Sequence, residues 1–226
     1  VLFVICRFAL IEKRKRFIVP IVALVILVDL WSFGRNYVNN EDFANKSVMQ
    51  RPFQATAADR AILKDTTRYR VFEPRLGMAH ARTAYFHNAI GGYHGAKPHR
   101  MQALYDYHLS KTITPNVVNM LNIKYTLQAA EDGRLSAGLN PNAYGNAWLV
   151  QEVISCRSAD EEIQRLATEN ITTMALTTES IPQREFVLDS LSSISLVDHK
   201  ANELRYKATV SSIAFAVFSE MHYPHG

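Results

Sequence analysis

The sequence predicts an α+β fold, in which a transmembrane helix precedes a mixed α/β extracytoplasmic domain and a truncated all-β, sandwich-like subdomain. An apolar run follows a tetrad of basic residues near the start of the chain. Helical and strand periodicities then alternate, and only strand patterns occur after residue 185. The predicted parts are the end of a preceding transmembrane helix (1–11), a cytoplasmic basic loop (12–16), the transmembrane helix (17–34), the extracytoplasmic α/β domain (35–184) and the β subdomain (185–226).

The transmembrane prediction depends on the segment from Phe17 to Phe33, whose first 12 residues are uninterrupted apolar residues or proline. A helix of this length spans about 26 Å, slightly less than the roughly 30 Å hydrocarbon core of a bilayer. Trp31 and Phe33 suit the aromatic belt at a membrane interface. The basic tetrad Lys13–Arg16 is expected to stay in the cytoplasm, so the residues from about 36 onward are expected outside it.

Two alternatives for this segment remain open. It could be a signal peptide, although a small-residue cleavage site is missing and another apolar run precedes it. It could also be a buried core helix, since its apolar residues cover every face. Because the sequence begins inside an apolar run and stops just after a strand-like segment, we expect a fragment of a longer protein.

The basic character of the chain belongs to the membrane flank. The formal net charge is +4, and residues 1–35 alone account for it, whereas residues 36–226 hold 19 basic and 19 acidic side chains. The large domain therefore lacks the electrostatic footprint of a nucleic-acid-binding protein. The lipid bilayer is the expected partner. Cys6 and Cys156 are expected at different depths, so no disulfide is predicted.

Local signals place the elements of the outer part. Thr56 with Asp59 and Ser158 with Glu161 resemble capping boxes that open helices. Strand-like alternation and helical spacing place the other elements. The expected helices are 57–64, 98–109, 116–121 and 159–167; the expected strands are 69–73, 123–127, 147–154, 173–177, 193–199, 203–210 and 213–220, with a short strand or a loop at 84–87.

No chemical motif stands out. Five histidines fall between His80 and His108, but without the spacing of a metal site, so no metal and no cofactor are predicted. Serine-nucleophile and phosphate-loop motifs are also missing. The glycine-rich segment Ile90–Gly95 is expected as a tight turn that presents Tyr93 and His94 and packs closely against the next helix, or as a ligand contact. Trp148, which follows the turn Asn140–Asn146, is expected in the core or stacked on a sugar.

Several segments, in order along nearly the whole chain, resemble the YfhO-type family of bacterial polytopic membrane proteins. They are Val28–Trp31, Arg51–Gln54, Ala58–Asp59, Ile62–Asp65, Tyr85–His87, Ile90–Lys97, Asn119–Tyr125, Asn140–Trp148, Ala159–Glu162, Val217–Glu220 and Tyr223–Pro224. The resemblance implies a C-terminal fragment of a protein with many transmembrane helices, of the kind seen in glycosyltransferases that use polyprenyl-phosphate sugars. The catalytic acids of such enzymes lie near the N-terminal helices, so no catalytic residue can be transferred to this chain.

The resemblance implies a region of the bacterial inner (cytoplasmic) membrane whose periplasmic domain positions a lipid-linked sugar or an envelope glycan. The candidate substrate-binding residues are Tyr93, His94, Lys97, Arg100 and Trp148. The alternative is a non-catalytic envelope scaffold or transport-associated protein whose outer domain binds a glycan or a protein. In both interpretations the fragment itself is not catalytic.

Overall fold

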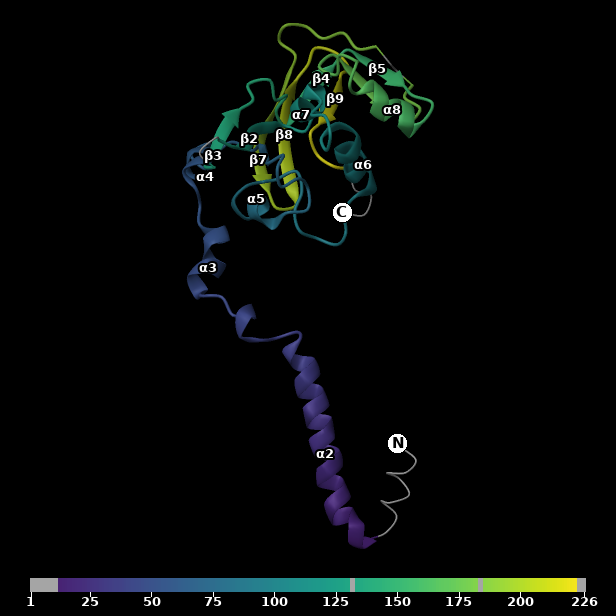
Figure 1. Cartoon of the computed structure of the whole chain (residues 1–226). Helices are drawn as coiled ribbons and strands as arrows, with labels where there is room; N and C mark the ends of the chain where they lie inside the picture. The colour runs from purple at the N-terminus through teal and green to yellow at the C-terminus, as the bar shows by residue number, and fades with distance from the viewer. Residues whose placement is uncertain (1–11, 131–132, 183–184, 223–226) are drawn as a thin grey trace. The chain divides into compact units, whose positions relative to one another are not determined.

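The computed structural model describes residues 12–130, 133–182 and 185–222. The chain divides into two compact units, residues 1–52 and 53–226 (Figure 1). The first unit contains one long apolar helix, and the second combines short helices with several small sheets. The predicted α+β class with an apolar N-terminal helix is confirmed. The prediction for residues 1–11 lies outside the described residues.

The long helix of the first unit, α2, runs from Glu12 to Arg35. Its 24 residues correspond to about 36 Å, enough to cross a bilayer. None of its apolar window is buried within the described structure, and Leu24 and Leu30 each expose more than half of their surface. The buried-core alternative therefore does not apply to α2, which is long and apolar enough to span a membrane.

The start of α2 differs from the prediction. Residues 12–16, expected as a loop, form the first helical turn, and Pro20 lies inside the helix. Lysine and arginine are good helix formers, so the basic tetrad extends the apolar helix. Pro20 cannot donate a backbone hydrogen bond, a defect that membrane helices commonly tolerate. Three short helices follow: η1 (Asn40–Asp42), α3 (Lys46–Gln50) and η2 (Arg51–Phe53).

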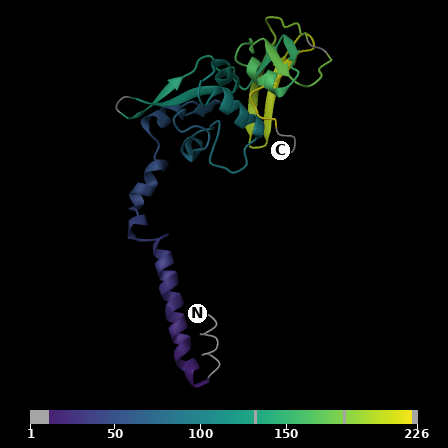
Figure 2. The same cartoon turned by 45° about the vertical axis from the view of Figure 1, so that its right-hand side comes forward.

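The second unit begins with a three-stranded sheet and the helices around it. Strand β2 (Ile123–Ala129) lies between β1 (Arg70–Phe72), to which it is parallel, and β3 (Leu135–Leu139), to which it is antiparallel (Figure 2). The helices of this part are α4 (Ala57–Ile62), α5 (Ala81–Phe86), α6 (His99–His108) and α7 (Pro115–Met120). Helix α4 packs against β3, and α7 packs against β2.

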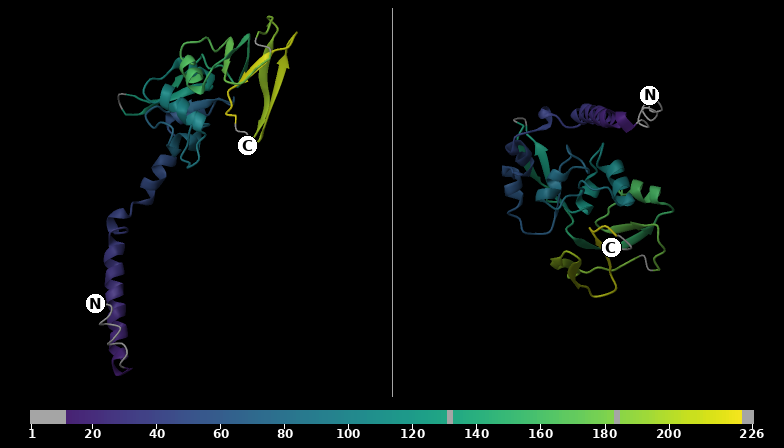
Figure 3. Two further views of the ribbon diagram at one scale, coloured as in Figure 1. Left: turned by 90° about the vertical axis from the view of Figure 1, so that its right-hand side faces the viewer. Right: turned by 90° about the horizontal axis from the view of Figure 1, so that it is seen from below.

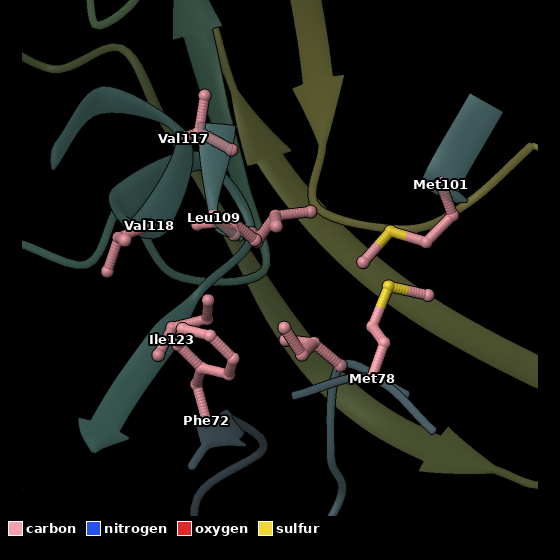
Figure 4. Packing of buried hydrophobic residues seen from close by; sticks show 9 residues of the cluster. Phe72, Met78, Met101, Leu109, Val117, Val118 and Ile123 are labelled. Atoms are coloured by element: carbon pink, nitrogen blue, oxygen red, sulfur yellow. The ribbon is translucent and has the colours of Figure 1, made fainter. Parts of the chain in front are cut away.

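The main hydrophobic cluster joins β1, β2, α6 and α7. Phe72 lies beside Ile123, and the side chains of Met78 and Met101 point toward each other (Figure 4). The cluster also contains Ile90, Leu109, Val117, Val118 and Leu121. A second cluster, of Ala58, Ile62, Tyr69, Val71 and Leu127, holds α4 to the sheet. Full burial of one such large side chain contributes roughly 1.5–3 kcal/mol, so these clusters hold α4, α6 and α7 on the sheet.

The C-terminal part consists of three two-stranded sheets and one helix. Strand β4 (Ala147–Val150) pairs antiparallel with β9 (Phe215–Phe218), and β5 (Glu152–Ser155) pairs parallel with β6 (Met174–Thr177). Strands β7 (Ser193–Lys200) and β8 (Glu203–Thr209) form a long hairpin with an irregularity between Leu196 and Asp198 (Figure 3). Helix α8 (Ala159–Arg165) packs near β6, and β7 packs near β4.

Three local predictions were wrong. Residues 81–86 form helix α5, capped by the side chain of His80, and not a strand or loop. Strand β3 was not predicted, because its sequence has no β-branched residue and it forms by pairing with β2. The expected strand 147–154 is two strands, β4 and β5, which belong to different sheets. Since β9 pairs with β4, the last strand belongs to a sheet that begins before residue 185.

Candidate functional site

The glycine-rich loop of residues 90–97 packs closely on the backbone of residue 78. A Cβ atom on Gly91 would lie 2.3 Å from the Met78 carbonyl oxygen and 2.9 Å from its Cα, so only glycine fits. The Gly92 amide donates to the same carbonyl at 3.0 Å. The expected close packing of this segment is therefore present, but its contact partner is the segment before α5 instead of the helix that follows the loop. Residues 90–95 form an irregular loop, and no turn hydrogen bond is found within them.

This loop presents two of the predicted binding residues. Tyr93 exposes 85% of its surface, and His94 is also exposed. The Nδ1 atom of His94 lies 2.7 Å from the Ala96 carbonyl oxygen, and because a carbonyl can only accept, Nδ1 carries a proton in this geometry. In the neutral ring the Nε2 atom is then an acceptor, so the loop offers an aromatic surface and a hydrogen-bonding ring side by side.

The other predicted binding residues have structural partners or lie elsewhere. Lys97 is half-buried at the end of the loop. Arg100, on α6, forms an ion pair with Glu162 of α8 at 3.0 Å. Trp148 donates its indole N–H to the Ile171 carbonyl at 3.0 Å and packs against the third hydrophobic cluster, of Val150, Val153 and Phe186. Within the described residues, no hydrogen bond or ring contact joins Trp148 to the loop, and the substrate-binding role of all five residues stays a prediction.

A buried polar network lies between α4, α5 and β1. Asp59 is fully buried and accepts hydrogen bonds from Arg82 and, at 3.0 Å, from His87. Glu73, 2% exposed, accepts from Thr83 at 2.9 Å and lies 3.4 Å from Arg82. One guanidinium therefore holds two buried carboxylates. Burial alone favours the neutral form of a carboxyl group, so Arg82 offsets a large desolvation cost.

Asp59 also caps α4. Burial would raise the pKa of Asp59, but hydrogen bonds from Thr56 and His87 and the charge of Arg82 outweigh it and hold this pKa below the ordinary value. The Thr56 amide and hydroxyl donate to Oδ2 at 2.8 and 2.7 Å. The predicted capping box is confirmed. The ion pairs of Asp59 were not predicted, because Arg82 and His87 lie more than 20 residues away along the chain.

Two atoms of this network have no hydrogen-bond partner among the described residues: Glu73 Oε1 and His87 Nδ1. His87 is 8% exposed, so neither it nor Asp59 can contact a substrate in this conformation. No group of three His, Cys, Asp or Glu side chains in the described part is arranged to hold a metal ion. The network joins α4 and α5 to the end of β1 and supports the loop that follows α5.

A pocket of about 420 Å³, lined by both polar and apolar atoms, lies in the second unit. One wall consists of Thr66, Thr67 and Arg68, a second of the turn Tyr144–Ala147, and a third of residues 194–199 of β7. Sequence reasoning did not find it, because its three walls are far apart along the chain. The dense turn formers of residues 139–146 were the one local signal.

Fold and sites together define an α+β protein with one helix long and apolar enough to span a membrane, among the residues that the structure describes. Comparisons with protein-family models, with curated proteins and with solved structures found no match. The resemblance to the YfhO-type family therefore stays a prediction.

Proposed function

We propose that the chain is the outer C-terminal region of a polytopic protein of the bacterial cytoplasmic membrane. In this proposal the parent resembles glycosyltransferases that use polyprenyl-phosphate sugars, and this region binds an envelope glycan or lipid-linked sugar without catalysing transfer. The observation that carries the proposal is the apolar helix α2, with no part of its apolar window buried, followed by a separate compact unit that displays an exposed aromatic loop.

The membrane part of the proposal follows from the solvation of α2. A helix whose apolar side chains are exposed on every face is favourable in hydrocarbon and costly in water. The basic tetrad at its start favours the cytoplasm. The second unit has its own hydrophobic clusters, so it needs no membrane contact to fold. This arrangement supports a periplasmic location for the second unit.

The binding part of the proposal follows from where the carboxylates lie. Asp59 and Glu73 are held by Arg82 and are closed to solvent. Asp65 is held by Lys124 and by the Tyr125 hydroxyl, at 2.5 and 2.9 Å. A general acid or base must reach its substrate within hydrogen-bond distance, and none of these three carboxylates is free to do so. Tyr93 and His94, in contrast, are exposed on a closely packed loop.

Topology provides the first test. A periplasm-dependent reporter fused after residue 42 should be active, and the chain should stay in membranes during carbonate extraction. A reporter active only in the cytosol, or release by carbonate, would contradict the proposal.

The second test uses the full reading frame: transfer from at least one polyprenyl-phosphate sugar of a donor panel is expected, and no transfer from any donor would contradict the enzymatic part.

The second candidate is a non-catalytic envelope scaffold or transport-associated protein. The observation that favours it is that the described acidic side chains of the core, Asp59 and Glu73, serve ion pairs. The two candidates differ in the first outer loop of the parent. An Asp or Glu just past its first helix, needed for transfer in mutagenesis, supports the enzyme, and a loop without one supports the scaffold.

A further inference from the structure

We propose that the pocket between β7, the Tyr144–Ala147 turn and residues 66–68, which combines polar and apolar side chains, binds a neutral sugar ring. The pocket shares no residue with the glycine loop, so the inference stands independently of the role of Tyr93. It goes beyond the proposed function by assigning a ligand class to a site that was not predicted from the sequence. Its volume of about 420 Å³ falls in the range of roughly 300–1,000 Å³ typical of small-molecule sites.

Strand β7 borders the pocket with the backbone groups of its edge as well as with side chains. Six consecutive residues, 194–199, border the pocket, although successive side chains of a strand point to opposite faces. Within the described residues β7 is hydrogen-bonded to β8 alone. Backbone N–H and C=O groups on its other edge are therefore available to a ligand, and a sugar hydroxyl can both donate to and accept from them.

The turn contributes an oriented amide and a fixed ring. The Asn122 amide donates to Asn146 Oδ1 at 3.3 Å, which leaves the Asn146 NH₂ group to donate into the pocket. Tyr144 is half-buried, and its ring is held by an edge contact with Trp148, with centroids 5.2 Å apart. A fixed aromatic ring beside a few placed polar groups is the usual composition of a small-molecule site.

The charges around the pocket favour a neutral ligand. Arg68 of the wall and the neighbouring Arg70 share the carboxylate of Glu220, at 3.2 and 3.0 Å, and together with the carboxylate of Asp198 these four formal charges sum to zero. Asp198 is exposed and forms no ion pair within the described part of the chain. Its carboxylate would repel an anion and accept hydrogen bonds from hydroxyl groups. The hydroxyl groups of an uncharged sugar ring can donate to the Asp198 carboxylate and accept from the donors of the pocket wall. A phosphate would be repelled by that carboxylate.

The test uses the whole chain in lipid nanodiscs and saturation-transfer NMR. The probes are glucose, mannose and N-acetylglucosamine, with glucose 6-phosphate as the charged comparison. We expect binding of at least one neutral sugar in the millimolar range and weaker binding of the phosphate. No signal from any neutral sugar, or tighter binding of glucose 6-phosphate, would overturn the inference.

A matched pair of variants locates the site. Ser195→Tyr adds a ring at a residue of the pocket lining, whereas Ser193→Tyr makes the same change two residues earlier on the same exposed face of β7, outside the lining. We expect at least a tenfold loss of sugar binding in Ser195→Tyr and wild-type binding in Ser193→Tyr, with unchanged Trp148 fluorescence in both. Equal binding in the two variants would refute the pocket as the site.

A third variant separates this inference from the proposed function. Because the glycine loop shares no residue with the pocket, the difference in sugar binding between Ser195→Tyr and Ser193→Tyr should persist in a Tyr93→Ala background. If Tyr93→Ala abolishes sugar binding and Ser195→Tyr does not, the pocket inference fails and the loop remains the binding site. A cytosolic topology reporter would contradict the proposed function while leaving sugar binding by the pocket intact.

Discussion

At the scale of single residues, Arg82 is the cation that compensates two buried carboxylates. Its guanidinium contacts the carboxylates of Asp59 and Glu73, both of which are buried. A buried ion pair is weak support for stability as a whole, but removal of one partner is strongly destabilising because a charge stays buried without compensation. The residue therefore fixes the junction between α4, α5 and β1.

Arg82→Met should destabilise the second unit by about 3–5 kcal/mol, because two buried carboxylates lose the guanidinium that holds them. The measurement is denaturant unfolding of the chain in detergent, followed by the fluorescence of Trp148 in a Trp31→Phe background, since the chain has two tryptophans. Arg75→Met, at an exposed position, is the control and should change stability by less than about 0.5 kcal/mol. Equal effects of the two variants would contradict the role of Arg82.

Acid should destabilise the second unit through Asp59 and Asp65. Burial raises the pKa of each, but hydrogen bonds and nearby cations outweigh it and hold each pKa below the ordinary value of 3.8. A carboxyl whose folded pKa is lowered contributes stability above its unfolded pKa and loses it as pH falls through the folded pKa. The denaturation midpoint should therefore be constant from about pH 7 to 5 and decline below about pH 4.

The pH profile has its own control. Asp65→Asn should flatten the decline, whereas Asp160→Asn, at an exposed position of α8, should leave its shape unchanged. In Arg82→Met the denaturation midpoint should in part rise as the pH falls, because protonation then neutralises two carboxylates that have lost their cation. A wild-type midpoint that stays constant down to about pH 2 would contradict the assignment of the lowered pKa values.

At the scale of elements, a helix or strand could be predicted when its sequence signal lies within a few residues of it. The signals Thr56–Asp59 and Ser158–Glu161 lie within four residues, and helices α4 and α8 begin where they predict. Thr56 and Asp59 form a reciprocal capping box, whereas Ser158 caps α8 alone, because the Glu161 side chain accepts from the Arg157 amide. Strand β3 and the break between β4 and β5 depend on pairing with distant strands. Such pairing follows from tertiary packing more than from local propensity, so it could not be predicted from the sequence.

The same distinction between local and long-range signals applies to the candidate sites. The loop at residues 90–95 was predicted because three glycines in five residues disfavour a regular element. The second site, the pocket, combines residues 66–68 with the turn after residue 143 and with β7. Its walls meet only in the folded chain. Trp148 was correctly placed on a strand, and its hydrogen bond to Ile171 required the position of a loop that no local pattern specifies.

Gly91→Ala tests the close approach of the glycine loop to Met78. An added methyl group would meet the Met78 backbone at 2.3–2.9 Å, so the loop or its support must move, at a cost of about 1–3 kcal/mol. Gly95→Ala is the matched control, since nothing lies within 4 Å of a Cβ atom placed at that position. Unfolding of both variants, together with proteolysis at the loop, should show destabilisation in Gly91→Ala alone. Similar stability of the two would contradict the packing argument.

At the scale of the whole molecule, α2 is the segment of the described residues that is long and apolar enough to span a membrane. Its apolar side chains have no protein partner in the described residues, and an exposed apolar surface larger than a few hundred Å² marks a membrane or a protein interface. The length and composition of α2 were predictable because the capacity of a helix to span a membrane is specified by its own sequence. Its extension to Glu12 was not predicted, because a run of basic residues is equally typical of a loop.

Val25→Arg tests the membrane role of α2. Val25 lies near the middle of the helix and is exposed, so a charge there should cost roughly 2.5–3.5 kcal/mol of insertion free energy. We expect a larger fraction of the variant in the carbonate-soluble pool and a reporter after residue 42 with reduced periplasmic activity. Val25→Leu should behave as the wild type. Unchanged membrane retention of Val25→Arg would argue that α2 is held by protein contacts.

The pairing of β9 with β4 has a consequence for the order of events during synthesis. The paired residues are about 65–71 positions apart, so this sheet cannot close until residue 218 has left the ribosome. Closing so long a loop is slow compared with the formation of helices and short hairpins. The nascent polypeptide therefore keeps β4 without its partner until then, and the arrival of β9 is the step that closes this sheet.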